Sequence, residues 1–598
     1  LSNLGMGYVF EELIRKFNEE NNEEAGEHFT PREVIDLMTH FIFDPIKDSI
    51  PYALSVYDPA CGSGGMLTEA QNFIEERYSN EDRDIFLYGK EINDETYAIC
   101  KSDMMIKGNN PENIRVGSTL ANDEFASTRF DFMLSNPPYG KSWVADQKNI
   151  IHDKKIIDSR FIVKLKDYWG NEQEVDATPR SSDGQLLFLM EMVNKMKPTD
   201  VSPLGSRIAS VHNGSSLFTG DAGGGESNIR RYIIENDLLN AIVQLPNNLF
   251  YNTGITTYIW LLSNNKPESR KGKVQLIDAS LLYRKLRKNL GQKNCESAPE
   301  HIQEINDVYL QGNDVQRQLD SNNDPIGLAT KVFDNQDFGY YKVNIERPDR
   351  RKAQFSAERL QSLRFDKSLL EPMEYMFNTY GDDIYQAGKI KEVEKDVMEW
   401  CEKQEISLHT KAKAKLFDVK HWTSLKALFE SAQAIMAHVG EAESSHFNVF
   451  KANVDQAIKA LGLKLSAPEK NSILNAVSWY DENAKKVVKK VEKLNEQKLA
   501  QLLAHLGCKE TDLADFGYFA TVKKGEYITY ESSADIRDSE SVPLQQSIHQ
   551  YFLDEVKPHV DEAWINLDSV KIGYEISFNK YFYQHKPLRS LEEVAQDI

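Results

Sequence analysis

The chain has 598 residues, of which 40% are hydrophobic and 27% charged, an ordinary balance for a globular protein. This length is too great for one hydrophobic core, so two or three domains are expected. The formal net charge of −21 argues against a protein that coats itself in nucleic acid, because phosphate contacts need clustered Lys and Arg. Any contact with DNA is therefore expected to be local or shared with a partner.

Membrane, disulfide and zinc chemistry are all disfavoured by the sequence. No apolar run approaches the length that a membrane span needs, and no secretory leader follows Leu1. The five cysteines are an odd number, lie far apart and form no CxxC pair, which argues against a disulfide framework and against a zinc site. We therefore expect a cytoplasmic protein with no metal site, and a start that is trimmed relative to a longer chain.

Apolar patterns divide the chain into an α/β part and a helical part. Residues 4–20 carry a helical stripe. From 31 to about 280, amphipathic segments such as 64–78 and 184–197 separate short apolar runs, which are LSVYDP, DIFLYGKEI, FDFMLSNPP, SRIASVHNG, LNAIVQLP, TTYIWLLSN and KVQLIDAS. Runs spaced in this way predict a mainly parallel sheet wound by crossover helices.

Two later segments have distinctive compositions. The glycine-rich stretch 220–231 predicts a mobile, exposed loop that opens a helix. Beyond about 350, strand-like runs give way to long helical stripes, notably over 423–437 and 484–503. The second stripe is basic on one side, which is typical of a solvated helix face, with contact to a phosphate backbone as the alternative. A domain boundary is expected near 345–355.

The segment VYDPACGSGGML, residues 56–67, follows a predicted strand and precedes a predicted helix. Glycines here can adopt positive φ and let a ligand approach the backbone at the helix start. Asp58 at the strand end would repel the pyrophosphate of a dinucleotide. The pattern favours a ligand with a cationic group, such as the amino-acid moiety of S-adenosylmethionine, and a plain strand-to-helix turn is the structural alternative.

Two further segments accompany this turn. Glu91 ends the next predicted strand, where an acidic residue can accept both hydroxyls of a ribose; an ordinary surface glutamate is the alternative. Upstream, GEHFTP (26–31) carries an aromatic residue and a Thr-Pro pair just ahead of a helix, with Thr30 as a candidate N-cap.

The stretch LSNPPYGKS, residues 134–142, ends another predicted strand. Pro137 and Pro138 lack N–H groups and cannot join a β-ladder, so the segment from Asn136 to Tyr139 predicts a stiff exit from the strand end. Because the carboxyl ends of parallel strands meet at one edge of a sheet, this turn and the glycine turn are expected at the same edge. An ordinary Asn-Pro turn is the structural alternative.

The ordered set EHFTP, DPACGSGG, YGKE and SNPPY resembles the N6-adenine DNA methyltransferases, in which cofactor motifs precede the catalytic motif. GDAGGGESNIRRYIIENDLLNAIVQLPNNLFYNTGI, GYEISFNKYFY and PLRSLEEV resemble, more narrowly, the modification (M) subunit of type I restriction-modification systems. The likeness covers roughly 1–350, and 571–598 extends it to the end. It implies a Rossmann-like S-adenosylmethionine-dependent methyltransferase sheet over 26–350, the end of an N-terminal helical domain over 1–25, and a helical C-terminal domain for subunit assembly over 351–598.

The resemblance implies direct transfer of a methyl group from S-adenosylmethionine to N6 of an adenine flipped out of double-stranded DNA, with no metal required. Its catalytic residues would be Asn136, Pro137, Pro138 and Tyr139. The Asn136 oxygen and the Pro137 carbonyl would accept the N6 hydrogens, and Tyr139 would stack on the base. The cofactor residues would be Glu27, His28, Phe29, Thr30, Pro31, Asp58, Ala60, Gly62, Ser63, Gly64, Gly65, Glu91 and Ser118.

Two positions are less defined by the resemblance. Ser118, or its neighbour Asn122, stands where many relatives have an acidic residue that contacts the cofactor's adenine. Phe218 and Phe250 are both candidates for the second face of the flipped base, and buried core phenylalanine is the alternative for each.

The implied partners are a specificity (S) subunit that supplies sequence recognition, a second copy of the M subunit, and a restriction (R) subunit. Three alternatives stay open: a solitary adenine methyltransferase, a protein glutamine N5-methyltransferase, and a scaffold that binds without turnover.

Overall fold

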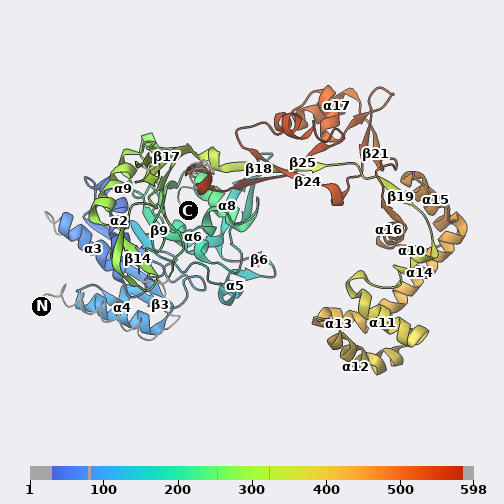
Figure 1. Ribbon diagram of the computed structural model, residues 1–598, viewed down its shortest axis with the longest axis horizontal. Coiled ribbons are helices and arrows are strands. Elements are labelled where there is room, and N and C mark those ends of the chain that lie inside the picture. Colours follow the sequence, from blue (N-terminus) through green and yellow to red (C-terminus); the bar gives the residue numbers. More distant parts are fainter. Residues whose placement is uncertain (1–29, 79–82, 252, 322–323, 583–598) are drawn as a thin grey trace, which may run out of the picture. The chain divides into compact units, whose positions relative to one another are not determined.

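The seven apolar runs predicted as strands are strands in the computed structural model, which describes residues 30–78, 83–251, 253–321 and 324–582 (Figure 1). The predicted helix over 4–20 lies outside these residues. The strands are β1 (Ala53–Asp58), β2 (Asp84–Glu91), β4 (Phe132–Ser135), β9 (Arg207–Asn213), β10 (Leu239–Gln244), β11 (Thr257–Ser263) and β12 (Lys273–Asp278). The helices predicted over 64–78 and 184–197 are α3 (Gly65–Arg77) and α6 (Gln185–Asn194). The predicted α/β fold is therefore confirmed.

With β3 (Ile114–Val116) and β17 (Ala329–Asp334), these strands form a nine-stranded sheet of order β17-β12-β10-β11-β9-β4-β1-β2-β3. The pairs from β3 through β2, β1 and β4 to β9 are all parallel. β11 runs antiparallel to both of its neighbours, and β17 runs antiparallel to β12. The strand order reverses between β1 and β4, and open α/β sheets bind ligands at such a point.

Side chains that alternate along the strands feed two apolar clusters, one on each face of the sheet. In β4, Phe132 and Leu134 belong to one cluster and Met133 to the other. The first cluster also takes residues of α2 (Arg32–Phe43), α3, α4 (Asp94–Ile106) and α9 (Pro299–Gln311), and the second takes residues of α6 and α8 (Gly225–Glu235). Figure 1 shows α2, α3 and α9 to the left of β9, and α6 and α8 to its right. The sheet is thus covered on both faces, as expected for parallel strands.

The segment 220–231 opens helix α8 as predicted, and Asp221 and Gly223 in its loop are exposed as expected, but the residues from Glu226 onward are buried. A Cβ added at Gly225 would stand 1.7 Å from the Thr178 carbonyl oxygen, so the backbone packs closely there. Arg230 is fully buried and donates hydrogen bonds to the carbonyls of Ser216, Thr219 and Tyr574. These contacts hold the segment against the sheet domain.

The chain forms two units. One holds the described residues up to 342 together with 541–547 and the described part of 570–598, and the other holds 343–540 and 548–569. Three of the boundaries fall within β18 (Gly339–Glu346), β24 (Asp538–Pro543) and β25 (Trp564–Tyr574), and the fourth lies at the start of α18 (Ile548–Tyr551). A single C-terminal domain over 351–598 therefore differs from the observed division, because the described residues from 570 onward return to the first unit.

In the second unit, the stripe over 423–437 is a helix, α14 (Val419–Val439), as predicted. The helix expected over 484–503 is wrong for its first half. β21 (Val488–Lys493) pairs antiparallel with β23 (Glu526–Tyr530), and helix α17 (Glu496–Leu506) begins only after it. β-branched valines fit a pleated surface well, and pairing with β23 overrides their helical spacing. Strands therefore continue beyond residue 350.

The structure also bears on the predictions about membrane spans, metal sites and cysteine pairing. Within the ranges that the structure describes, no helix combines the length and apolar character needed to cross a membrane. In the same ranges, no cluster of three or more His, Cys, Asp or Glu side chains has the arrangement of a metal site. The five cysteines are free thiols.

Candidate active site

The carboxyl ends of β1 and β4 meet at one edge of the sheet. β1 ends at Asp58 and β4 at Ser135, and the two strands pair in parallel with Tyr57 beside Met133. The Ser135 hydroxyl donates to Asp58 Oδ1 at 2.7 Å. One hydrogen bond therefore joins the acid of the glycine turn to the residue that precedes Asn136.

The turn after β1 requires glycine at two positions. Gly62 and Gly64 have φ of 54° and 85°, in the left-handed region that L side chains rarely adopt. A Cβ at Gly64 would also stand 2.8 Å from Cys100 Sγ and Met104 Cε of α4. Helix α3 starts directly after this turn, at Gly65, so its first N–H groups lie at the same sheet edge. The other two predicted members of the turn, Ala60 and Ser63, are half-buried.

Asp58 is an almost fully buried carboxyl group, with 2% of its surface exposed. Burial raises the pKa of Asp58 to about 7, and the negative charge of Glu91 adds to this effect. The hydrogen bonds from the Ala60 N–H and the Ser135 hydroxyl lower the pKa of Asp58 but do not cancel the effect of burial. A cation beside this carboxyl would favour its ionised form, so the position suits a positively charged ligand group.

Glu91, the last residue of β2, braces the glycine turn. Its Oε2 accepts from the Gly62 N–H at 3.0 Å, and its Oε1 accepts from the Asn93 N–H at 2.8 Å. Only 7% of Glu91 is exposed, so the alternative of an ordinary surface glutamate is wrong. The carboxylate therefore lies at the tip of β2, directly beside the turn.

The turn after β4 is largely buried. Asn136 is 8% exposed and Tyr139 is 7% exposed, while Pro137 is buried and Pro138 half-buried. Burial raises the pKa of Tyr139 well above its usual range, so its phenol stays neutral at ordinary pH. The Tyr139 ring belongs to the apolar cluster that contains α2 and α3. The turn thus presents a buried amide and a neutral aromatic ring at one strand end.

Thr30 contributes to this turn rather than to a helix cap. The N-cap of α2 is Pro31, which makes no side-chain capping hydrogen bond, so the expectation that Thr30 caps the helix is wrong. Instead, the Thr30 hydroxyl accepts from Asn136 Nδ2 at 3.0 Å. This bond assigns the Asn136 nitrogen to Thr30 and directs the Asn136 Oδ1 to the other side of the amide. Glu27, His28 and Phe29 lie outside the described residues.

Ser118 lies in the turn that follows β3. The Gly117 N–H at the start of this turn donates to the Glu91 carbonyl at 2.8 Å. The half-buried Ser118 hydroxyl accepts from the Ala121 N–H at 3.2 Å. The Asn122 carbonyl accepts from the Lys90 ammonium of β2. The turn is therefore anchored to the end of β2, and the Ser118 hydroxyl stabilises it from within.

Comparison with known protein families identifies the family to which a chain with this site belongs. The family profile described as N-6 DNA Methylase matches residues 3–325, which is more than half of the chain. The chain belongs to the N-6 DNA methylase family. The matched range contains every residue of the candidate site described above.

Individual relatives match this chain over a similar range. The methylase subunit of type I restriction enzyme MjaVII from Methanocaldococcus jannaschii is 31% identical over 339 residues, covering 52% of this chain and 52% of that protein. The methylase subunit of type I restriction enzyme HindI from Haemophilus influenzae is 28% identical over 281 residues, covering 46% and 54%. The chain spans about half the length of the curated relatives it matches.

Among solved structures, the methyltransferase subunit of a type I restriction-modification system from Streptococcus thermophilus aligns with this chain at 24% identity and a TM-score of 0.42. The alignment covers 56% of this chain and 60% of that chain.

The two candidate phenylalanines, Phe218 and Phe250, lie in different surroundings. Phe250 is 2% exposed and belongs to the same apolar cluster as Tyr139. Phe218 is 60% exposed. Phe250 therefore shares a cluster with the aromatic ring of the Asn136–Tyr139 turn, whereas Phe218 faces solvent.

Asp183 supports the Asn136–Tyr139 turn through the residue that follows it, Gly140. It was not among the site residues predicted from the sequence. Its Oδ1 accepts from the Gly140 N–H at 3.0 Å. Its Oδ2 accepts from Gln185 Nε2 at 2.7 Å and from the Ser215 hydroxyl at 2.8 Å. The only signal in the sequence was an acid two residues before an amphipathic helix, which is a common position for helix capping.

We expect Asp183→Ala to lower the rate of methyl transfer by about tenfold or more while the affinity for cofactor stays within about twofold. The change removes an acceptor from four donors, of which Gln185 Nε2 and the Ser215 hydroxyl keep Asn213 Oδ1 as a partner. A buried donor left without a partner costs about 1–3 kcal/mol, so the melting temperature should also fall. Steady-state kinetics at saturating cofactor and calorimetric binding of S-adenosylhomocysteine measure the two quantities. Asp167→Ala, in the exposed turn between β7 (Ile162–Lys166) and β8 (Glu172–Asp176), is the control. Equal loss of cofactor affinity and rate in Asp183→Ala would contradict the assigned support.

Proposed function

We propose that this chain is the modification (M) subunit of a type I restriction-modification system and methylates N6 of adenine in double-stranded DNA, with S-adenosylmethionine as methyl donor. The observation that carries the proposal is the 2.7 Å hydrogen bond between Ser135 and Asp58. It supports a donor site at the glycine turn and an acceptor site at Asn136, on neighbouring ends of one sheet. Family membership and the relatives named above support the same reaction.

The donor side fits a sulfonium cofactor that carries a cationic amino-acid end. The buried Asp58 carboxyl would gain an ammonium partner, which offsets the loss of solvation that raises its pKa. At Gly64 a side chain would collide with Cys100 and Met104 of α4, so glycine lets the turn pack against that helix, whereas a Cβ at Gly62 would meet nothing within 4 Å. Glu91 at the tip of β2 is placed to receive a ribose. When bound, S-adenosylmethionine supplies an electrophilic methyl group.

On the acceptor side, the chain's own groups would hold the amine of an adenine turned out of the duplex. The Asn136 Oδ1 and the Pro137 carbonyl would accept the two N6 hydrogens and thereby aim the nitrogen lone pair at the methyl group. The proton that the nitrogen sheds after transfer passes to water, so no stronger base is needed. The Thr30 contact and the two prolines hold these acceptors in place before the base arrives.

Tyr139 is assigned to one face of the base, and Phe250, which is buried in the same large apolar cluster, is the candidate for the other. We expect Tyr139→Ala to weaken base extrusion by about tenfold, since stacking contributes about 1–3 kcal/mol per base, while Tyr139→Phe keeps the ring and stays near wild type. The fluorescence of 2-aminopurine at the target position reports extrusion directly. An unchanged titration for Tyr139→Ala would remove Tyr139 from this role.

The type I assignment also supplies the partners. A specificity (S) subunit would provide sequence recognition, because the net charge of −21 disfavours an independent hold on DNA. The unit formed by 343–540 and 548–569 is proposed to serve subunit assembly. A second M subunit and a restriction (R) subunit would complete the complex.

The experiment that tests this function is tritiated methyl transfer to duplex DNA, with and without a co-expressed S subunit. The proposal expects incorporation into DNA that depends on the S subunit. Equal incorporation without it would favour a solitary adenine methyltransferase. Label found in protein would favour a glutamine N5-methyltransferase, and label found nowhere would favour a scaffold.

A further inference from the structure

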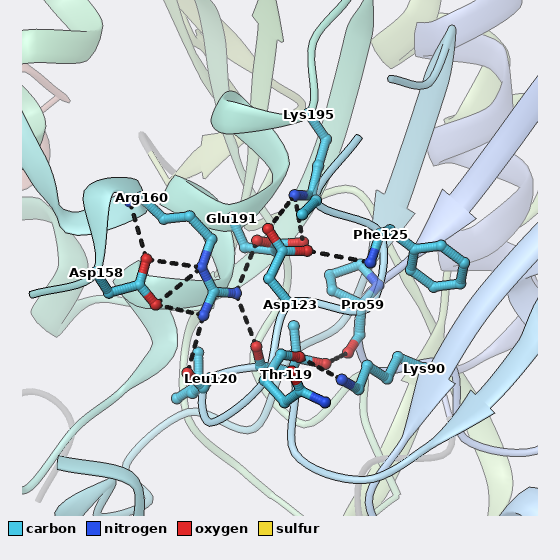
Figure 2. A network of polar contacts seen from close by, with 12 residues as sticks. Pro59, Lys90, Thr119, Leu120, Asp123, Phe125, Asp158, Arg160, Glu191 and Lys195 are labelled. Carbon is cyan, nitrogen blue, oxygen red and sulfur yellow. Dashed lines mark hydrogen bonds and ion pairs between the residues drawn. The ribbon is translucent and has the colours of Figure 1, made fainter. Parts of the chain in front are cut away.

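The turn after β3, residues 117–125, is held by buried charged side chains from several other elements (Figure 2). We name six residues the buried ion network: Lys90, Asp123, Asp158, Arg160, Glu191 and Lys195. Four of them, Lys90, Arg160, Glu191 and Lys195, are 0–4% exposed. Burying charges is costly even when they are paired, and apolar side chains of similar volume often stabilise a fold equally well. Stabilisation of the fold alone therefore does not explain why these charged side chains are buried together.

Arg160 makes the central contacts of the buried ion network. Its Nη1 donates to the Thr119 carbonyl at 2.8 Å and to Glu191 Oε2 at 3.0 Å. Its Nη2 donates to the Leu120 carbonyl at 3.0 Å and to Asp158 Oδ2 at 2.6 Å. Because a guanidinium presents its donors in a rigid planar fork, it can hold two successive carbonyls and two carboxylates at once, which an ammonium cannot do. Arg160 therefore fixes the two successive peptide groups whose carbonyls belong to Thr119 and Leu120.

Lys195 holds the far end of the same turn. Its ammonium lies 2.5 Å from Asp123 Oδ2 and 3.9 Å from Glu191 Oε1. Asp123 Oδ1 in turn accepts from the Phe125 N–H at 3.2 Å. Tyr57 of β1 donates to Glu191 Oε1 at 3.3 Å. Each charge of this part faces an opposite charge, which is the condition under which buried ions are tolerated.

The turn is also tied to the strand ends that form the candidate donor site. The Thr119 hydroxyl donates to the Pro59 carbonyl at 2.5 Å, and Pro59 follows Asp58 at the start of the glycine turn. On the neighbouring strand, Lys90 precedes Glu91 and donates to the Asn122 carbonyl. Figure 2 shows Pro59 and Lys90 on the side of the turn away from Arg160. The turn is thus clamped between Arg160 and the ends of β1 and β2.

We propose that Arg160 is a positioning residue of the cofactor site, which fixes the turn 117–122 against the adenosine end of S-adenosylmethionine. The inference rests on the proposed function, in which Glu91 at the end of β2 receives the ribose. Strand β3 pairs with β2, so the turn that follows β3 lies beside Glu91 at the same edge of the sheet. The Ser118 hydroxyl is bonded to the Ala121 N–H within the turn. The turn would therefore meet the adenosine end with a backbone that is held from within and from both sides.

The test compares Arg160→Lys with a matched control, Arg207→Lys. Lysine at 160 keeps the positive charge beside Asp158 and Glu191 but cannot also hold both turn carbonyls. Arg207 is equally buried and donates to the Phe41 carbonyl, yet it starts β9 at the sheet edge opposite the site. We expect Arg160→Lys to weaken calorimetric binding of S-adenosylhomocysteine about tenfold or more, with the rate at saturating cofactor within about threefold of wild type.

Arg207→Lys should lose a similar amount of thermal stability and keep its affinity within about twofold. Equal effects on affinity in the two variants, or none in either, would overturn the positioning role. If Arg160→Lys does not fold, Thr119→Val provides the test of the positioning role. It removes only the hydrogen bond to the Pro59 carbonyl and should weaken binding of S-adenosylhomocysteine by about threefold or more. Wild-type protein that binds no S-adenosylhomocysteine would refute the proposed function itself, whereas wild-type binding with unaltered variants would refute this inference alone.

Discussion

Asn136→Ala is expected to lower methyl transfer by about 100- to 1000-fold, the usual effect of removing one preorganised acceptor or donor at a reacting centre. The Asn136 amide is held by the Thr30 hydroxyl at 3.0 Å, so its oxygen is oriented before a base arrives. Alanine removes this acceptor and leaves the glycine turn intact. Cofactor affinity should therefore stay within about twofold, as measured by calorimetry with S-adenosylhomocysteine.

Asn236→Ala is the matched control, because Asn236 caps the end of α8 and its Nδ2 donates to the Tyr232 carbonyl on the surface. It should leave both rate and affinity unchanged. Turnover near the wild-type rate in Asn136→Ala would defeat the role assigned to Asn136. Loss of cofactor binding in the same variant would show instead that the Asn136–Tyr139 turn supports the donor site.

Asp58→Asn is expected to weaken cofactor binding by about 10- to 150-fold at pH 7.5, since a hydrogen-bonded charge pair contributes about 1.5–3 kcal/mol. It should also remove the pH dependence of that binding. Because the pKa of Asp58 is about 7 in the free protein, a cationic ligand must displace a proton at lower pH. Wild-type affinity should rise about tenfold per pH unit below 7. It should fall again above about pH 8, where an α-amino group loses its charge.

The same pKa makes a prediction for stability. Between about pH 4 and pH 7, folded Asp58 keeps a proton that the unfolded chain has released. Stability from this group is therefore greatest at low pH and falls as the pH rises towards 7, by at most about 1.4 kcal/mol per pH unit. Asp58→Asn should flatten this slope, whereas Asp307→Asn, an exposed change on α9, should not.

For cofactor binding, a wild-type affinity that does not change between pH 5.5 and 7.5 would contradict the assigned role of Asp58.

Much of the sheet could be predicted because each strand is a short apolar run with its own boundaries. The reversal of strand order between β1 and β4 explains why Asp58 and Asn136 could be expected at one edge from topology alone. The segment around Val488 could not be assigned correctly, since its valines satisfy a helical spacing and only pairing with β23 makes them a strand.

The supports of the site were beyond reach of the sequence. Arg160 contacts the carbonyl of Thr119, 41 positions away, and Asp183 contacts the N–H of Gly140, 43 positions away. Backbone carbonyls and N–H groups are the same at every residue, so such contacts leave no pattern of side chains to recognise. Thr30 was assigned to a cap because its neighbours fit one, but its partner is Asn136.

The most direct test of the account is to identify the methylated product. DNA incubated with S-adenosylmethionine, this chain and its S subunit would be digested to nucleosides and separated by liquid chromatography with mass spectrometry. The account predicts N6-methyldeoxyadenosine with the wild-type chain and its loss with Asn136→Ala. Methyl label on cytosine, on protein or on no product at all would contradict it.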